Sequence, residues 1–87
     1  MAMQQIKETR KEVYVLRDTD RNTTVGVYTS EKMVKDGVKS YLIHVGSDLV
    51  LSKFRDELKE LLRELIKYGK TEDSWENFSM ETFVINQ

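Results

Sequence analysis

The sequence contains no cysteine and no proline. Without cysteine the chain cannot form a disulfide framework, a thiolate zinc site or a cysteine nucleophile, and this composition is typical of a reducing cytosol. Without proline it lacks the strongest breaker of helices and strands, so its turns must be built from four glycines and from runs of Asp, Asn, Ser and Thr. We therefore expect a cytoplasmic protein.

Long apolar runs and an excess of one charge are also missing. No apolar stretch approaches the roughly 20 residues of a membrane span, and the first residues lack the order of a signal peptide. The 87 residues carry 14 basic and 15 acidic side chains, which gives a net charge of −1. A chain with almost no net charge produces only a weak long-range electrostatic field, which argues against binding to nucleic acid or membranes.

Two strands are predicted near the start of the chain. Residues 11–17 and 23–28 are rich in β-branched and aromatic side chains, and the five residues between them are short and polar. This pattern predicts a β-hairpin. It places residues 1–10 in a flexible N-terminal segment and residues 11–87 in a single domain.

A first helix is expected over residues 31–45. Apolar residues recur there at helical spacing, and Thr29 or Ser30 can cap the first turn. Gly37 leaves an alternative, because glycine costs about 1 kcal/mol relative to alanine inside a helix. In that alternative the helix ends at Gly37 and residues 38–45 form a strand.

A longer amphipathic helix is predicted over residues 49–68. Leucines and aromatic residues fall on one face of this segment, and charged residues cover the other. Gly46 and Ser47 separate it from the first helix, and Gly69 ends it. A short helical turn over 74–78 and a closing strand over 80–85 follow.

These elements predict an α+β fold of order β-β-α-α-β, with a three-stranded antiparallel sheet whose last strand lies beside the first. Both faces of that sheet are apolar, because β-strand side chains alternate and the strands carry apolar residues in both registers. Helices on one side leave the other face to be closed by the N-terminal segment, a second copy of the chain, a partner or a ligand, unless the helices straddle the sheet. The residues expected at such an interface are Tyr14, Leu16, Phe83 and Ile85.

Catalytic and metal-binding patterns are incomplete. Asp18, Asp20 and Asn22 match the start of a calcium loop, but Thr23 stands at the glycine position and Thr29 at the glutamate position, which favours a hairpin turn. His44 is the single histidine and has no serine or cysteine motif near it. We therefore expect no enzyme, no metal site and no cofactor.

A second possibility is a site for a phosphate-bearing ligand. Lys32, Lys35 and Lys39 recur at helical spacing, and Arg17 lies near the hairpin loop. Lysines can bind phosphate and Tyr28 can stack on a base. A charge run of this kind is also typical of a solvated helix face.

The amino-acid sequence of the hairpin and the last strand resembles that of a group of small, uncharacterised proteins of bacteriophages and bacteria. The residues that carry the resemblance are Val13-Tyr14-Val15-Leu16, then Val25 to Lys32 (VGVYTSEK), and Phe83-Val84-Ile85-Asn86. The resemblance implies an accessory or anti-defence factor that binds a host protein or sequesters a signalling nucleotide. We therefore hypothesise a non-enzymatic interaction protein that forms homo-oligomers, with a nucleotide-binding module as the alternative.

Overall fold

The computed structural model describes residues 10–86, and the predicted N-terminal segment lies outside them except for Arg10. Its strands are β1 (Arg10–Asp18), β2 (Thr23–Tyr28) and β3 (Phe78–Asn86), and its α-helices are α1 (Glu31–His44) and α2 (Arg55–Tyr68). The α+β class and the element order are those predicted from the sequence. Two short 3-10 turns, η1 (Asp48–Val50) and η2 (Ser52–Phe54), join α1 to α2.

The strands form one antiparallel sheet in the order β2-β1-β3, so the last strand does lie beside the first. The hairpin turn between β1 and β2 places Asn22 at φ +53°, a left-handed conformation that asparagine tolerates better than most residues. A register shift after Leu16 makes Val25 an extra residue on β2, and Val25 packs against the core. The predicted hairpin is confirmed.

The first helix runs through Gly37, so the alternative of a strand over residues 38–45 is wrong. The Ser30 hydroxyl accepts a 3.1 Å hydrogen bond from the backbone N–H of Met33 and caps the helix. Gly37 is tolerated because the ring of Tyr28 occupies the space of its missing side chain. A Cβ there would lie 2.8 Å from Cε1 of Tyr28 and closer still to the hydroxyl.

The second helix is shorter than predicted. The α-helix has 14 residues, and Leu51 before it adopts an extended conformation with ψ 146°. Leu49 is 1% exposed whereas Leu51 is 45% exposed, so the chain turns to bury one leucine and leaves the other outside. This turn replaces the start of the predicted helix with η1 and η2. Gly69 ends α2 at φ +77°, as predicted.

The helical turn predicted over 74–78 is also absent from the described chain. Asn77 accepts a hydrogen bond from the backbone N–H of Ser74 and donates one to its carbonyl, so it holds an irregular loop instead. Asp73 adopts φ +61° in this loop. Strand β3 then begins at Phe78, earlier than expected.

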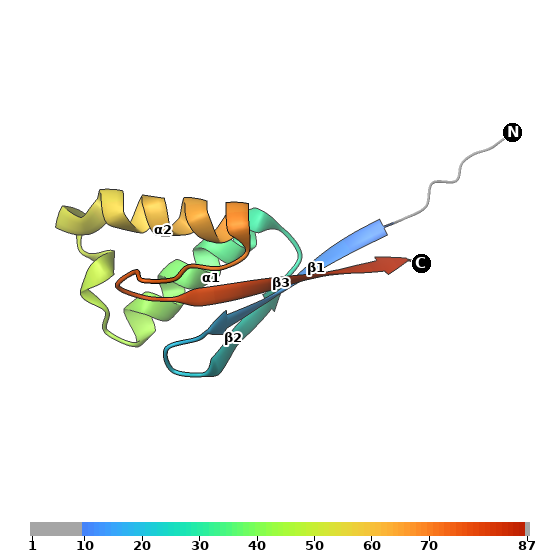
Figure 1. Cartoon of the computed structure of the whole chain (residues 1–87), viewed down its shortest axis with the longest axis horizontal. Coiled ribbons are helices and arrows are strands. Elements are labelled where there is room, and N and C mark those ends of the chain that lie inside the picture. The colour runs from blue at the N-terminus through green and yellow to red at the C-terminus, as the bar shows by residue number, and fades with distance from the viewer. Residues whose placement is uncertain (1–9, 87) are drawn as a thin grey trace, which may run out of the picture.

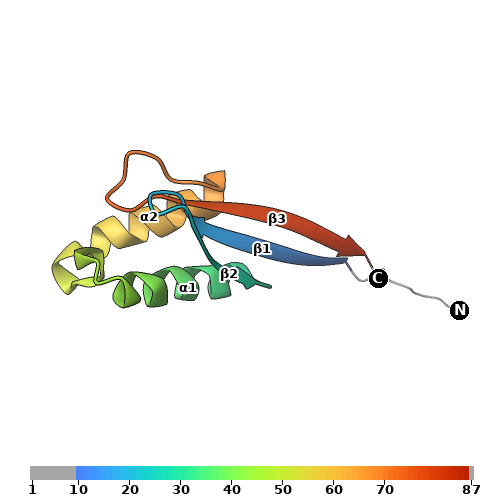
Figure 2. The same ribbon diagram turned by 90° about the horizontal axis from the view of Figure 1, so that it is seen from below.

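Both helices pack against the same face of the sheet, and the β1–β3 ribbon extends past their ends (Figures 1 and 2). The core lies between these two layers. Its buried apolar residues are Tyr14, Leu16, Val34, Val38, Leu42, Leu49, Leu61, Leu62, Leu65 and Phe78. The helices therefore do not straddle the sheet, and within residues 10–86 no element covers its other face, while the predicted closure by the N-terminal segment lies outside these residues.

Candidate interaction surface

The strand register assigns each apolar residue of the ribbon to a face. Paired residues in an antiparallel sheet share a face, and Val13 pairs with Phe83 while Val15 pairs with Val27. With Ile85, two residues beyond Phe83, these side chains point away from the helices. We call this set, Val13, Val15, Val27, Phe83 and Ile85, the open face.

The open face is accessible to solvent. Val27, Phe83 and Ile85 are 61%, 51% and 44% exposed, and Val13 and Val15 are half-buried by their neighbours. Monomeric proteins rarely leave several large apolar side chains together on one sheet face. The open face is therefore an uncovered apolar surface of the described sheet.

The interface predicted from the sequence combined residues of both faces. Phe83 and Ile85 do lie on the open face. Tyr14 and Leu16 lie on the covered face, where they are 7% and 0% exposed beneath the helices. They cannot contact a partner in this fold, because α1 and α2 fill that side. In the sequence, Val13 and Val15 alternate with Tyr14 and Leu16, which indicates two apolar faces. Which of these faces the helices cover could be decided only from the positions of the helices.

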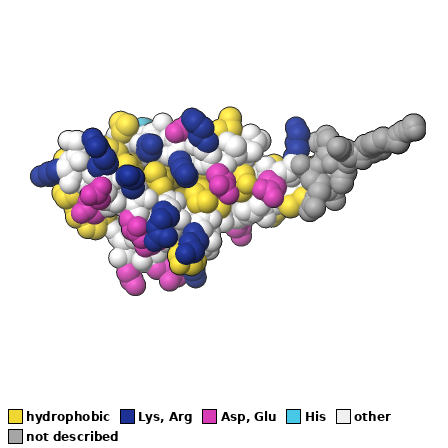
Figure 3. Space-filling view, turned by 90° about the horizontal axis from the view of Figure 1, so that it is seen from above, with side chains coloured by type: hydrophobic (Ala, Val, Ile, Leu, Met, Phe, Trp, Pro, Cys, Tyr) yellow, Lys and Arg dark blue, Asp and Glu magenta, His cyan; other side chains and the backbone are white. Residues whose placement is uncertain are grey.

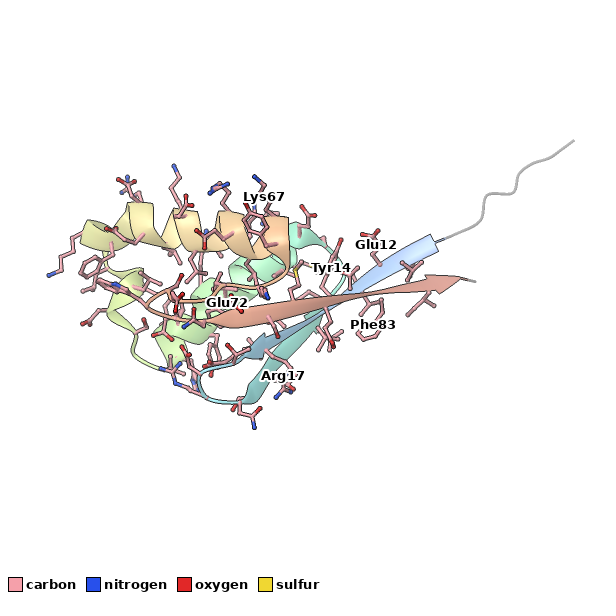
Figure 4. All side chains as sticks on the ribbon, viewed as in Figure 1. Glu12, Tyr14, Arg17, Lys67, Glu72 and Phe83 are labelled. Atoms are coloured by element: carbon pink, nitrogen blue, oxygen red, sulfur yellow. The ribbon has the colours of Figure 1, made fainter. Side chains whose placement is uncertain are left out.

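In the part of the chain that the structure describes, the end of the β1–β3 ribbon is exposed on both faces. β2 begins to pair with β1 only at Tyr14, so residues 10–13 of β1 have β3 as their single neighbour among the described strands. Glu12 and Phe83 point to opposite sides of this ribbon (Figure 4). Val84, on the side of Glu12, is 45% exposed. A two-stranded ribbon of this kind is at best marginally stable by itself.

One polar contact links the ribbon to the core. The hydroxyl of Tyr14 donates a 2.6 Å hydrogen bond to Oε1 of Glu12. That bond, with burial and the negative charge of Glu12, raises the pKa of Tyr14 from 10.0 to about 12. The phenol is therefore neutral at physiological pH and acts as a donor.

Charged residues of both signs border the open face. Lys11, Arg17 and Glu81 lie on the same side of the sheet as Phe83, by the register of their strands. The guanidinium of Arg17 donates 2.8 Å hydrogen bonds to Oγ1 of Thr24 and Oδ1 of Asn22. Arg17 is thus held at the hairpin end of this face.

The residues predicted to bind a phosphate-bearing ligand do not converge on one site. Arg17 lies on the open face, whereas Tyr28 lies on the covered side and lines a groove of about 520 Å³ between β2 and α1. Lys32 is on the exposed surface of α1 and forms a 2.9 Å ion pair with Asp36. Lys35 lines a different groove, between α1 and α2, and Lys39 is exposed.

The groove between β2 and α1 is aromatic and carries a carboxylate. It is lined by Val25, Tyr28, Met33, Asp36, Gly37, Ser40, Tyr41 and His44. No lysine or arginine is among these residues, so the groove offers no counter-charge to a phosphate. His44 is exposed near the end of α1.

The hairpin loop uses its acidic side chains for structure. Asp20 accepts a 3.0 Å hydrogen bond from the backbone N–H of Asn77 and ties the hairpin to the loop before β3. Asn22 accepts from Arg17. Among the described residues no group of three or more His, Cys, Asp and Glu side chains could hold a metal ion. The calcium-like spacing therefore builds a turn.

Asp18 is a buried carboxylate at the end of β1. It accepts hydrogen bonds from the hydroxyl of Tyr41 at 2.7 Å, from the guanidinium of Arg21 at 2.8 Å and from the backbone N–H of Arg21 at 3.0 Å. Burial by itself would raise the pKa of Asp18, but the bonds from Tyr41 and Arg21 outweigh it and hold that pKa below its usual value. Arg21 also pairs with Glu76 at 3.0 Å. This network anchors α1, the hairpin and the last loop to one another.

None of the helices within residues 10–86 is long and apolar enough to cross a bilayer. Comparison of the chain with protein-family models, with curated proteins and with solved structures finds no match.

Proposed function

We propose that this protein is a non-enzymatic interaction module of the cytoplasm that binds through the open face of its sheet, and that the occupant of this face is a second copy of the chain. The observation that carries the proposal is the exposure of Val27, Phe83 and Ile85 together on a sheet face that neither helix covers. Packing two such faces together removes apolar surface from water, which is the main driving force of association.

The charges around the face support a symmetric pair. In a two-fold dimer the same patch meets itself, so it must complement its own charge pattern. Lys11 and Arg17 are positive and Glu81 is negative on this side of the sheet, so a rotated copy can place opposite charges against one another. A patch of one sign would repel its copy.

The size of the face sets the expected strength. Strands β1 and β3 have nine residues each, which makes them about 30 Å long, and three strands are about 14 Å wide. Because β2 has only six residues and covers part of that length, the projected area is less than roughly 400 Å² per chain, which is below the roughly 800 Å² per partner of a standard specific interface. We therefore expect a weak dimer whose population rises with protein concentration.

The test is light scattering coupled to size-exclusion chromatography over a range of protein concentrations. The wild-type mass should rise from 10.3 kDa toward twice that value. Phe83→Glu, which puts a charge beside Val13 on this face, should stay at the mass of one chain. Ile43→Glu is the matched control, because Ile43 is 65% exposed but lies on α1, and it should behave as wild type.

Phe83 and Ile43 are 51% and 65% exposed, so each substitution should change the free energy of unfolding by no more than about 1 kcal/mol. A wild-type mass of one chain at every concentration would contradict the dimer. Equal loss of association in both variants would show that the open face is not the contact.

A further inference from the structure

A second surface lies on the helical side of the molecule, in the groove of about 380 Å³ between α1 and α2. Its floor is apolar, formed by Leu62, which is 6% exposed, and by Ile66, which is partly buried against the core. Its rim is basic, with Lys35 from α1 and Lys59, Arg63 and Lys67 from α2. Figure 3 shows Lys and Arg side chains around apolar surface on this side. We call it the basic groove.

The positive charges of the basic groove are mostly uncompensated. Of its rim residues, only Arg63 takes part in a salt bridge of the described chain, with Glu60. Lys35, Lys59 and Lys67 thus place three ammonium groups without a described salt bridge around an aliphatic floor, and that of Lys67 lies 5.3 Å from the centre of the Tyr68 ring. The chain has a net charge of −1, so the positive electrostatic field at this groove is opposite in sign to the net charge of the protein.

The spacing of the rim fits a helix as the ligand. Lys59, Arg63 and Lys67 lie four residues apart on α2, so they are repeated about every 6 Å along its axis. Acidic residues four apart on a partner helix laid along α2 have the same repeat. A third helix can pack against two adjacent helices by placing its apolar side chains in the groove between them.

Other ligand classes fit the groove less well. A membrane-binding surface needs apolar side chains that protrude into lipid, whereas the floor here is recessed and Leu62 is almost buried. A nucleotide site of the usual kind offers an aromatic ring for stacking, and the lining of this groove contains none.

We propose that the basic groove is a docking site for an acidic amphipathic helix of a partner protein, which inserts aliphatic side chains between α1 and α2 and places carboxylates against Lys35, Lys59 and Lys67. This inference is independent of the dimer, because the groove and the open face lie on different sides of the sheet.

The experiment is a titration of the ¹⁵N-labelled full chain, followed by its amide NMR signals. The probe is a helical peptide of about 14 residues with leucines at positions i, i+3 and i+7 and glutamates on both flanks. Its control is the same peptide with glutamine in place of every glutamate. The acidic peptide should shift signals of Lys35, Leu62 and Ile66 and bind at least tenfold more tightly than the control.

Two double variants locate the contact. Lys35→Glu with Lys59→Glu should weaken binding of the acidic peptide at least tenfold. Lys53→Glu with Lys70→Glu makes the same change in net charge away from the groove and should leave binding within twofold of wild type. Thermal melting checks that both double variants fold. If the Lys35→Glu, Lys59→Glu variant does not fold, the Lys35→Gln, Lys59→Gln variant takes its place.

Three outcomes would overturn the proposal. The first is equal affinity for the acidic and the glutamine peptides, or no binding of either. The second is a set of shifted signals that maps to the open face around Phe83. The third is binding to vesicles containing phosphatidylserine that depends on Lys35 and Lys59, with no response to the peptide, which would assign the groove to a membrane.

Discussion

The contact between Tyr28 and Gly37 gives a prediction whose sign depends on the structure. From helix propensity, Gly37→Ala should stabilise α1 by about 1 kcal/mol. In the folded protein the new Cβ would overlap the end of the Tyr28 ring, which also lies 2.6 Å from the place of a Cβ on Gly26. The ring is therefore confined between two glycines and must move outward when Cβ is added.

The cost of that movement can be estimated from area. A tyrosine buries roughly 150–250 Å² when it packs fully. If the displaced ring loses about 100 Å² of contact, the loss is about 2.5 kcal/mol at 25 cal/mol per Å². Gly37→Ala should then destabilise the wild type by about 1.5 kcal/mol. With Tyr28→Ala already present, the same change should stabilise by about 1 kcal/mol.

Urea denaturation of the wild type, the two single variants and the double variant measures this directly as a double-mutant cycle. We expect a coupling free energy of about 2.5 kcal/mol between the two positions. The reasoning is refuted if Gly37→Ala stabilises the wild type as much as it stabilises the Tyr28→Ala variant.

The polar contacts give further predictions. Tyr41→Phe removes a hydrogen bond to a charged buried group and should cost about 1.5 kcal/mol in urea denaturation, while a cost near zero would contradict a role for that bond. Because the pKa of Asp18 is lowered in the folded state, its stabilising effect is present above about pH 4 and is lost as the pH falls through the folded value. Asp18→Asn should therefore be less stable at pH 7 and lose less stability than wild type in acid, and parallel pH curves would refute this. The pKa of Tyr14 is raised from 10.0 to about 12, so its contribution is complete below pH 10 and is lost between those two values. Tyr14→Phe should flatten the stability curve in that alkaline range, and an unchanged slope would count against the bond to Glu12.

Much of the fold follows from local patterns in the sequence. The hairpin is specified by two β-branched runs around a polar loop, and Ser30 and Gly69 mark a helix start and a helix end as such residues usually do. The position of β3 beside β1 follows from the rule that connections stay short and do not cross. These features depend on neighbours in the sequence, so they can be read without the tertiary structure.

The missed features depend on tertiary contacts. Helical periodicity places Leu51 on the apolar face with Phe54 and Leu58, yet packing against the core buries Leu49 and leaves Leu51 exposed. Asn77 breaks the expected helical turn through hydrogen bonds that the sequence pattern does not display. For the same reason, the sequence does not indicate which face of the sheet the helices cover. The predicted interface therefore included Tyr14 and Leu16, which lie on the covered face.

The candidate sites show the same division. The stripe of Lys59, Arg63 and Lys67 can be read from the sequence as one side of an amphipathic helix. That these residues line a groove can be seen only in the fold, which places Lys35 of α1 across from them. The spacing of four residues from Lys35 to Lys39 suggested one continuous stripe, whereas of these two lysines only Lys35 lines the groove.

The central claim is that two chains meet through the open face. The most direct test is an isotope-filtered NOE experiment on an equal mixture of ¹³C-labelled and unlabelled protein, at a concentration where scattering gives the dimer mass. We predict intermolecular NOEs from the ring of Phe83 to the methyl groups of Val27 and Ile85. Intermolecular NOEs confined to helix residues such as Ile43, with none from Phe83, would contradict the account.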